Sequence, residues 1–146
     1  MSKAIVCISI LVLSLALLPS AGATSPAGPV TIVTAISFAA FPFSGTFTVT
    51  VGSALLGCST GTFVDFPFAL APSAIRKVFT CGTGGTFTFI FRPSPAPGPG
   101  DANGHWEAFE GTGDFAGLRG QGNFSVVFIP PDSGVETLTG KIHFDP

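Results

Sequence analysis

The sequence predicts an all-β protein of eight short antiparallel strands. Three observations support this class. Runs of alternating β-branched and aromatic residues recur after residue 23, turn-forming residues separate them, and that part of the chain shows no convincing helical period. Only 10% of the 146 residues are charged, whereas 46% are hydrophobic and 16 are phenylalanines, which excludes a disordered chain. Six basic residues against eight acidic ones also argue against a nucleic-acid partner.

The first 23 residues are expected to form a secretory signal peptide. Lys3 provides a positive start, residues 4–18 are almost wholly apolar, and Ala21-Gly22-Ala23 provides a small-x-small cleavage site. A membrane anchor is less favoured, because a helix needs roughly 20 apolar residues to span a bilayer. We therefore expect one domain, residues 24–146, that is secreted and keeps no membrane anchor after cleavage. The periplasm and the cell surface are alternative locations.

Three segments show the clearest strand pattern. In 46–51 and 86–91, every second residue is apolar, and in 123–129 the apolar positions include both faces. This period of two is typical of a strand with one buried face. Five further strands are expected at 30–38, 60–66, 74–81, 105–110 and 135–144.

A proline- and glycine-rich segment, residues 93–104, interrupts this pattern. Its repeated prolines cannot donate hydrogen bonds to a sheet and favour extended polyproline geometry. We expect a twelve-residue surface loop here that acts as a stiff spacer without a partner; the alternative is that it covers one end of the molecule.

Two cysteines, Cys58 and Cys81, remain once the signal peptide with Cys7 is removed. In an oxidising compartment such a pair is expected to form a disulfide. A bridge closing a loop of about 24 residues should stabilise the fold by roughly 3.5 kcal/mol. Metal binding or a catalytic thiol is less favoured, because His105 and His143 are both distant in sequence.

Eight short strands can close into a barrel or pack as a two-layer sandwich. An immunoglobulin sandwich is disfavoured, because Trp106 follows both cysteines instead of lying between them. An eight-stranded barrel has room inside for side chains or one small ligand. The expected lining residues are Phe47, Phe87, Phe89 and Phe91.

The most specific motif is a glycine-rich segment, residues 111–122, with five glycines in twelve positions. We expect a strand to end, turn tightly and restart, with Phe115 and Leu118 pinning the turn to the core. A phosphate-binding loop is excluded, because no helix follows and no Walker lysine is present. The turn motif consists of Gly111, Gly113, Phe115, Gly117 and Gly120.

This motif resembles the glycine turn of dirigent proteins and allene oxide cyclases, and more closely that of small secreted bacterial proteins of the same β-barrel superfamily. The matching order is Cys58 with Gly-Thr-Phe at 61, Cys81 with Gly-Thr-Phe at 85, Trp106, and then the glycine turn. The resemblance covers roughly residues 45–129. It implies an eight-stranded antiparallel, calycin-like barrel, and it adds Trp106 and Arg119 to the candidate ligand-binding residues inside the barrel.

The same resemblance implies a cavity for a hydrophobic guest. Cyclases and dirigent proteins hold a reactive intermediate and steer its closure or coupling with acidic residues, tyrosines and water. This chain has no tyrosine, and no residue matches their catalytic acid. Three hypotheses follow: a non-catalytic secreted barrel that binds a small apolar ligand or an extracellular partner, a structural or surface-interaction protein with a filled core, and a cyclase- or dirigent-like enzyme.

The enzyme hypothesis needs ionisable groups inside the barrel. It is excluded if Asp65, His105, Glu107 and Arg119 all face outward. Glu107 and Glu110 are expected on opposite faces of one strand, which makes them poor paired acids. His105, Glu107 and His143 could form a metal set only if their strands are adjacent. We expect neither a metal nor a cofactor.

Two remaining sequence features receive ordinary interpretations. Ser133 lies in a turn rather than at a nucleophile elbow. Asn123 begins a glycosylation sequon, which has meaning only in a eukaryotic host.

Overall fold

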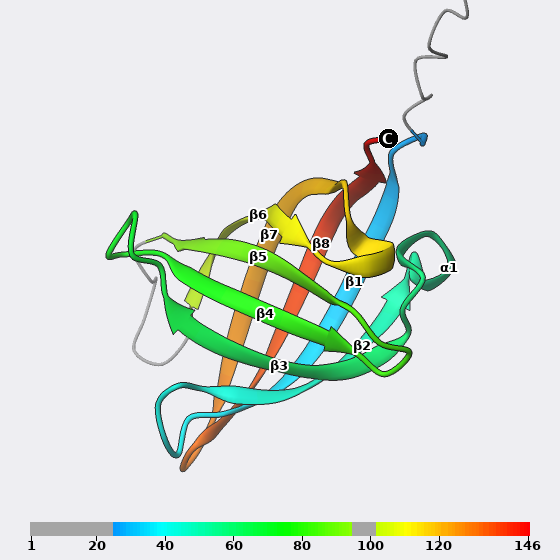
Figure 1. Cartoon of the computed structure of the whole chain (residues 1–146). Coiled ribbons are helices and arrows are strands. Elements are labelled where there is room, and N and C mark those ends of the chain that lie inside the picture. The colour runs from blue at the N-terminus through cyan, green and yellow to red at the C-terminus, as the bar shows by residue number, and fades with distance from the viewer. Residues whose placement is uncertain (1–24, 95–101) are drawn as a thin grey trace, which may run out of the picture.

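The computed structural model describes residues 25–94 and 102–146 (Figure 1). The predicted signal peptide, 1–23, and the middle of the predicted loop, 95–101, lie outside these residues. Within the two described ranges, no helix is both long enough and apolar enough to cross a membrane.

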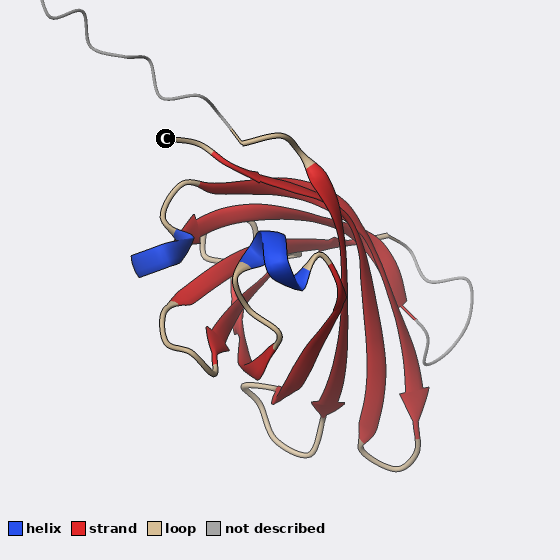
Figure 2. Cartoon of the chain, turned by 90° about the vertical axis from the view of Figure 1, so that its right-hand side faces the viewer, coloured by secondary structure: helices blue, strands red, loops and turns tan. Residues whose placement is uncertain are grey.

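Eight antiparallel strands form one closed barrel, in which each strand pairs with its neighbours in the chain and β8 pairs with β1 (Figures 1 and 2). The predicted fold class is confirmed. A short helix α1 (Ser53–Leu56) joins β2 to β3, and a 3₁₀ turn η1 (Gly113–Phe115) joins β6 to β7. The strands are β1 (Gly28–Ser37), β2 (Ser44–Val51), β3 (Thr60–Pro67), β4 (Ile75–Cys81), β5 (Thr86–Pro93), β6 (Ala102–Gly111), β7 (Leu118–Ile129) and β8 (Ser133–Phe144).

The period-two patterns set the inner face of the barrel. In β2, Phe47 and Val49 are buried while the alternating threonines are exposed. In β5, Phe87, Phe89 and Phe91 are all buried inside. Alternation places every second side chain on the same side of a strand, so closing the sheet gathers these rings into one core.

The predicted loop at 93–104 was too long at both ends. Pro93 is the last residue of β5 and pairs with Gly104, which already belongs to β6. A Cβ atom at Gly104 would lie 2.8 Å from Cε1 of the Phe124 ring. Glycine is therefore suited to β6 at this point, and proline is tolerated at a strand end, where no ladder donor is needed.

A register shift between Thr88 and Phe89 marks a bulge in the β5–β6 pairing. It corrects the expectation that Glu107 and Glu110 lie on opposite faces, because the extra residue brings both to the outer wall. There Glu107 pairs with Arg92 at 2.7 Å and Glu110 with Arg76 at 3.7 Å.

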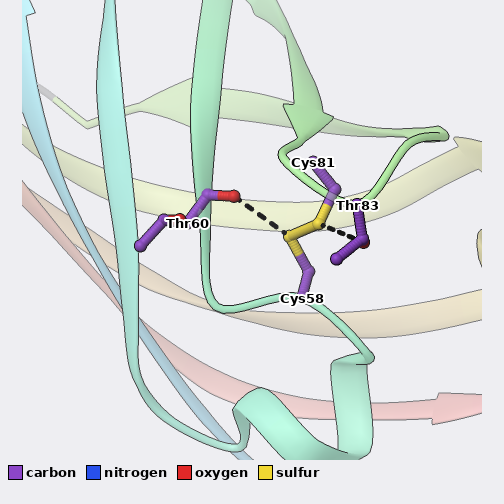
Figure 3. The surroundings of a disulfide bond; sticks show 4 residues. All are labelled: Cys58, Thr60, Cys81 and Thr83. Carbon is purple, nitrogen blue, oxygen red and sulfur yellow. Dashed lines mark hydrogen bonds between the residues drawn. A yellow bond between two sulfur atoms is a disulfide. The ribbon is translucent and has the colours of Figure 1, made fainter.

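The two ends of the barrel differ. The plugged end carries α1 and η1, whose residues Leu56 and Phe115 are buried in the core (Figure 1). The open end carries the β1–β2, β3–β4 and β7–β8 connections, together with the end of β5 and the start of β6. A disulfide bridges Cys58, just before β3, and Cys81, at the end of β4, with their Cα atoms 5.9 Å apart (Figure 3). The predicted bridge thus fastens the connection that contains α1.

Aromatic side chains fill the half of the barrel next to the plugged end. Phe79 stacks on Phe87 with ring centroids 4.7 Å apart, and Phe89 stacks on Trp106 at 4.5 Å. The Trp106 indole Nε1 donates to the backbone oxygens of Asn123 and Thr139 at 3.1 and 3.3 Å. The rings in this half are therefore packed against one another, and the indole is held by hydrogen bonds.

Candidate functional site

A cavity of about 380 Å³ opens at the other end of the barrel. Its volume falls within the range of roughly 300–1,000 Å³ that is typical of small-molecule sites. Most of its lining is apolar and comes from the ends of several strands and from the β1–β2 connection. The lining includes Ile36, Phe38, Phe43, Phe91, Phe124 and Phe128.

Three charged side chains line the same cavity: Asp65 of β3, Lys77 of β4 and Glu136 of β8. Their side chains are 6%, 2% and 4% exposed. Asp65 and Lys77 are directly paired in the β3–β4 register, so both point inward from neighbouring strands. Buried charges of this kind are rare unless they are paired. We call these three residues the acid–lysine cluster.

The lysine joins the two acids unequally. Its Nζ donates a 2.7 Å hydrogen bond to Glu136 Oε2, and the Thr34 hydroxyl donates to the same oxygen at 3.2 Å. The distance from Lys77 Nζ to Asp65 Oδ1 is 3.3 Å, which is an ion-pair contact. Among the described residues, however, Asp65 Oδ1 has no hydrogen-bond partner. Asp65 is therefore the less satisfied of the two acids.

Burial raises the pKa of Asp65 from 3.8 to about 6. The positive charge of Lys77 opposes this rise and the negative charge of Glu136 adds to it. The loss of hydration outweighs the attraction of the lysine because the carboxyl group lies in an apolar wall. At neutral pH Asp65 is still mostly ionised. With both acids ionised and Lys77 protonated, the acid–lysine cluster carries a net charge of −1.

The predicted ligand-lining residues lie at different levels of the barrel. Phe91 lines the cavity, whereas Phe47, Phe87, Phe89 and Trp106 are buried in the filled half beside the plugged end. The cavity thus lies nearer the open end than these rings.

The expectation that Arg119 points into the barrel was wrong. Its side chain is 49% exposed, and its Nε lies 3.2 Å from Asp145 Oδ2. The preceding residue, Leu118, is fully buried. The strand alternation therefore turns Arg119 outward.

Sequence reasoning missed Lys77 and Glu136 as site residues. The signal was present in the alternation, because Lys77 is in phase with the buried Phe79, and Glu136 with the buried Leu138. A charged residue in the inward phase of an apolar strand is the pattern that would have found both. Asp65, in phase with Phe63, was named only as one of four groups whose orientation decides the enzyme hypothesis.

The other three of those groups lie outside the barrel. His105 and Glu107 are exposed on β6, and Arg119 is exposed on β7. His143 lies 3.3 Å from Asp145. In the part of the chain that the structure describes, no group of three or more His, Cys, Asp and Glu residues could hold a metal ion.

The glycine turn belongs to the plugged end and does not line the cavity. β6 ends at Gly111, η1 follows, and β7 starts at Leu118. Gly113 and Gly117 have positive φ values of 60° and 77°, which glycine adopts without strain. Phe115 and Leu118 are buried in the core as expected, and Gly120 lies in β7 against Ile142. The role of this motif is therefore structural: it helps to close the plugged end of the barrel.

No family model, curated protein or solved structure matches the chain. The resemblance to the cyclase and dirigent superfamily therefore stays a prediction. The geometry itself offers an apolar cavity with one under-satisfied carboxylate, which can hold an apolar molecule by one polar group or exchange a proton with it.

Proposed function

We propose that the protein is an exported β-barrel that binds a small apolar molecule in the cavity at its open end. The observation that carries this proposal is the cavity of about 380 Å³ with a largely apolar lining. It favours a binding protein over a structural protein with a filled core, since an unfilled volume remains at the open end. The Cys58–Cys81 bridge is compatible with an extracellular or periplasmic location, which the apolar run at 4–18 independently predicts.

The rim of the open end supports entry of an apolar guest. Phe41 in the β1–β2 connection and Phe128 near the end of β7 are exposed. Phe38 packs against both Phe43 and Phe128, with ring centroids 5.2 and 5.9 Å apart. The exposed aromatic rings are therefore continuous with the cavity lining. An apolar molecule that enters along them can lose its hydration in steps.

A pair of adjacent valines provides a matched test. Val126 lines the cavity, while Val127 is 57% exposed on the outer wall of the same strand. The neutral fluorescent probe N-phenyl-1-naphthylamine should bind the disulfide-bonded chain and be displaced by other apolar molecules. Val126→Phe should weaken this binding about tenfold by occupying the cavity, as expected for a clash of roughly 1.4 kcal/mol.

Val127→Phe is the control and should bind the probe like the unchanged protein. Denaturation curves of both variants verify that they remain folded. Equal probe affinities for the two variants, or no binding by the unchanged protein, would rule out the cavity as the binding site.

A second candidate is a cyclase- or dirigent-like enzyme. The observation that favours it is Asp65, an inward-facing carboxyl group whose pKa of about 6 suits proton exchange near neutral pH. The test is to generate an unsaturated fatty-acid epoxide in situ and to separate the cyclic products by chiral chromatography. If the protein is catalytic, the unsubstituted chain should give an excess of one enantiomer of the cyclic product. Asp65→Asn should lose this excess. The same product mixture with and without protein would exclude this activity.

A further inference from the structure

The cavity has an electrostatic preference that its volume does not reveal. Two carboxylates and one ammonium group line it, so one negative charge lacks a partner when all three are ionised. Lys77 is bound mainly to Glu136, at 2.7 Å, and Asp65 Oδ1 is left without a hydrogen bond among the described residues. A buried cluster with one more negative than positive charge is costly, and a second positive charge brought beside it lowers that cost.

We infer that the apolar ligand is an amine, whose protonated ammonium group binds beside Asp65 while its hydrocarbon part fills the cavity. This inference rests on the proposed binding function and names its ligand class. An ammonium group placed beside the Asp65 carboxylate would bring the net charge of the acid–lysine cluster to zero.

The aromatic lining favours the same class of ligand. Five phenylalanine rings border the cavity, and the faces of such rings attract cations. The barrel interior already contains such contacts, because Lys77 Nζ lies 4.0 Å from the centre of the Phe63 ring and 5.1 Å from that of Phe91. A second cation on this wall would meet the same kind of surface.

A carboxylate ligand fits the cavity poorly. The Lys77 side chain is 2% exposed, and both of its acids lie within 3.3 Å of Nζ. An anion approaching that lysine would therefore also approach two like charges. A neutral alcohol could donate to Asp65, but it would leave the net charge of the cluster unchanged.

The inference predicts a pH dependence. The charged groups that face Asp65 are Lys77 from β4 and Glu136 from β8, and β1 presents the uncharged Thr34. The described histidines lie on the outer wall. Because the pKa of Asp65 is about 6, only about one molecule in ten has it ionised at pH 5. A primary alkylamine remains protonated at both pH 5 and pH 7, so its affinity should be about tenfold lower at pH 5.

The experiment compares three probes with the same eight-carbon chain: octylamine, 1-octanol and octanoate. The chain, purified with its disulfide intact, is titrated at pH 7 and pH 5 while its backbone amides are followed by NMR. We expect octylamine to shift cavity amides and to bind at least tenfold more tightly than 1-octanol at pH 7. Its affinity should fall about tenfold at pH 5, whereas that of 1-octanol should stay constant.

Two isosteric variants locate the effect. Asp65→Asn should remove the preference for octylamine and its pH dependence. Glu107→Gln removes a carboxylate of the outer wall that pairs with Arg92, and it should change neither.

The outcomes separate this inference from the proposed function. If 1-octanol or octanoate binds as well as octylamine, or if Asp65→Asn keeps the preference, the amine inference is wrong and apolar binding stands. If N-phenyl-1-naphthylamine binds but octylamine does not, the amine inference alone also fails. If neither that dye nor any eight-carbon probe shifts cavity amides, both proposals fail.

Discussion

Replacing Asp65 by asparagine should make the protein more stable at neutral pH, although it removes an ion-pair partner of Lys77. Asparagine keeps the shape of the side chain and cannot ionise. The carboxyl group of Asp65 is buried, and its pKa rises from 3.8 to about 6 on folding. The ionised form is therefore disfavoured in the folded protein, even with Lys77 Nζ 3.3 Å away.

The size and sign of the effect follow from this pKa difference. Because the pKa is higher in the folded state, the associated stability is fully present below pH 3.8 and is lost as the pH rises through 6. At about 1.36 kcal/mol per pKa unit, the loss approaches roughly 3 kcal/mol at pH 7. At pH 7 the free energy of unfolding of Asp65→Asn should exceed that of the unsubstituted protein by up to this amount. At pH 3.5 the free energies of unfolding of the two proteins should agree within about 0.5 kcal/mol.

The assay is urea denaturation at both pH values, followed by the fluorescence of Trp106, the single tryptophan of the chain. This indole lies in the filled half of the barrel and reports global unfolding. Glu107→Gln is the control and should change the free energy of unfolding by less than about 0.5 kcal/mol. The reasoning would be refuted if Asp65→Asn were less stable than the unchanged protein by more than about 1 kcal/mol at pH 7, since the attraction of Lys77 would then exceed the cost of burial.

Three further changes test the core and the cluster by the same denaturation assay. Lys77→Met should cost about 3–5 kcal/mol at pH 7 and less at pH 4, because it leaves two buried carboxylates without a cation; an equal cost at both pH values would contradict this. Replacing Cys58 and Cys81 together by serine should cost about 3.5 kcal/mol, as should reduction of the unchanged protein, and a cost below about 1 kcal/mol would show that the bridge adds little. Gly140→Ala should cost about 1–3 kcal/mol, because the new Cβ would clash with the Gln121 backbone oxygen and would lie 2.5 Å from Cζ2 of Trp106, and an unchanged midpoint would mean that both β7 and the indole can move aside.

Most of the architecture could be read from local patterns. All eight expected strands exist, and the clearest of them, 46–51, 86–91 and 123–129, lie within β2, β5 and β7. The errors occurred where a contact from another strand changed the local preference. Gly104, read as part of a loop, belongs to β6, where it lies beside the Phe124 ring. The bulge in the β5–β6 pairing turned Glu107 and Glu110 to the same side.

The site was much less predictable than the fold. Phenylalanines were correctly expected inside, but the sequence contained no signal for which of them meet in a solid core and which border a cavity. Phe91 lines the cavity, whereas Phe87 and Phe89, four and two positions earlier on the same face, are packed in the core. The difference arises from their height in the barrel, which depends on the register of all eight strands.

Alternation along the chain was sufficient for the strands, and it also contains the inward phase of Lys77 and Glu136, because a period of two needs only neighbouring residues. The disulfide partners followed from the two cysteines that remain after the predicted signal peptide. The meeting of Asp65, Lys77 and Glu136 has a different origin. The last two are separated by 59 positions in sequence and lie on β4 and β8, which are not neighbouring strands in the sheet. Only closure of the sheet brings them within 2.7 Å of each other across the interior, and it does so because a narrow barrel forces inward side chains of non-adjacent strands into contact.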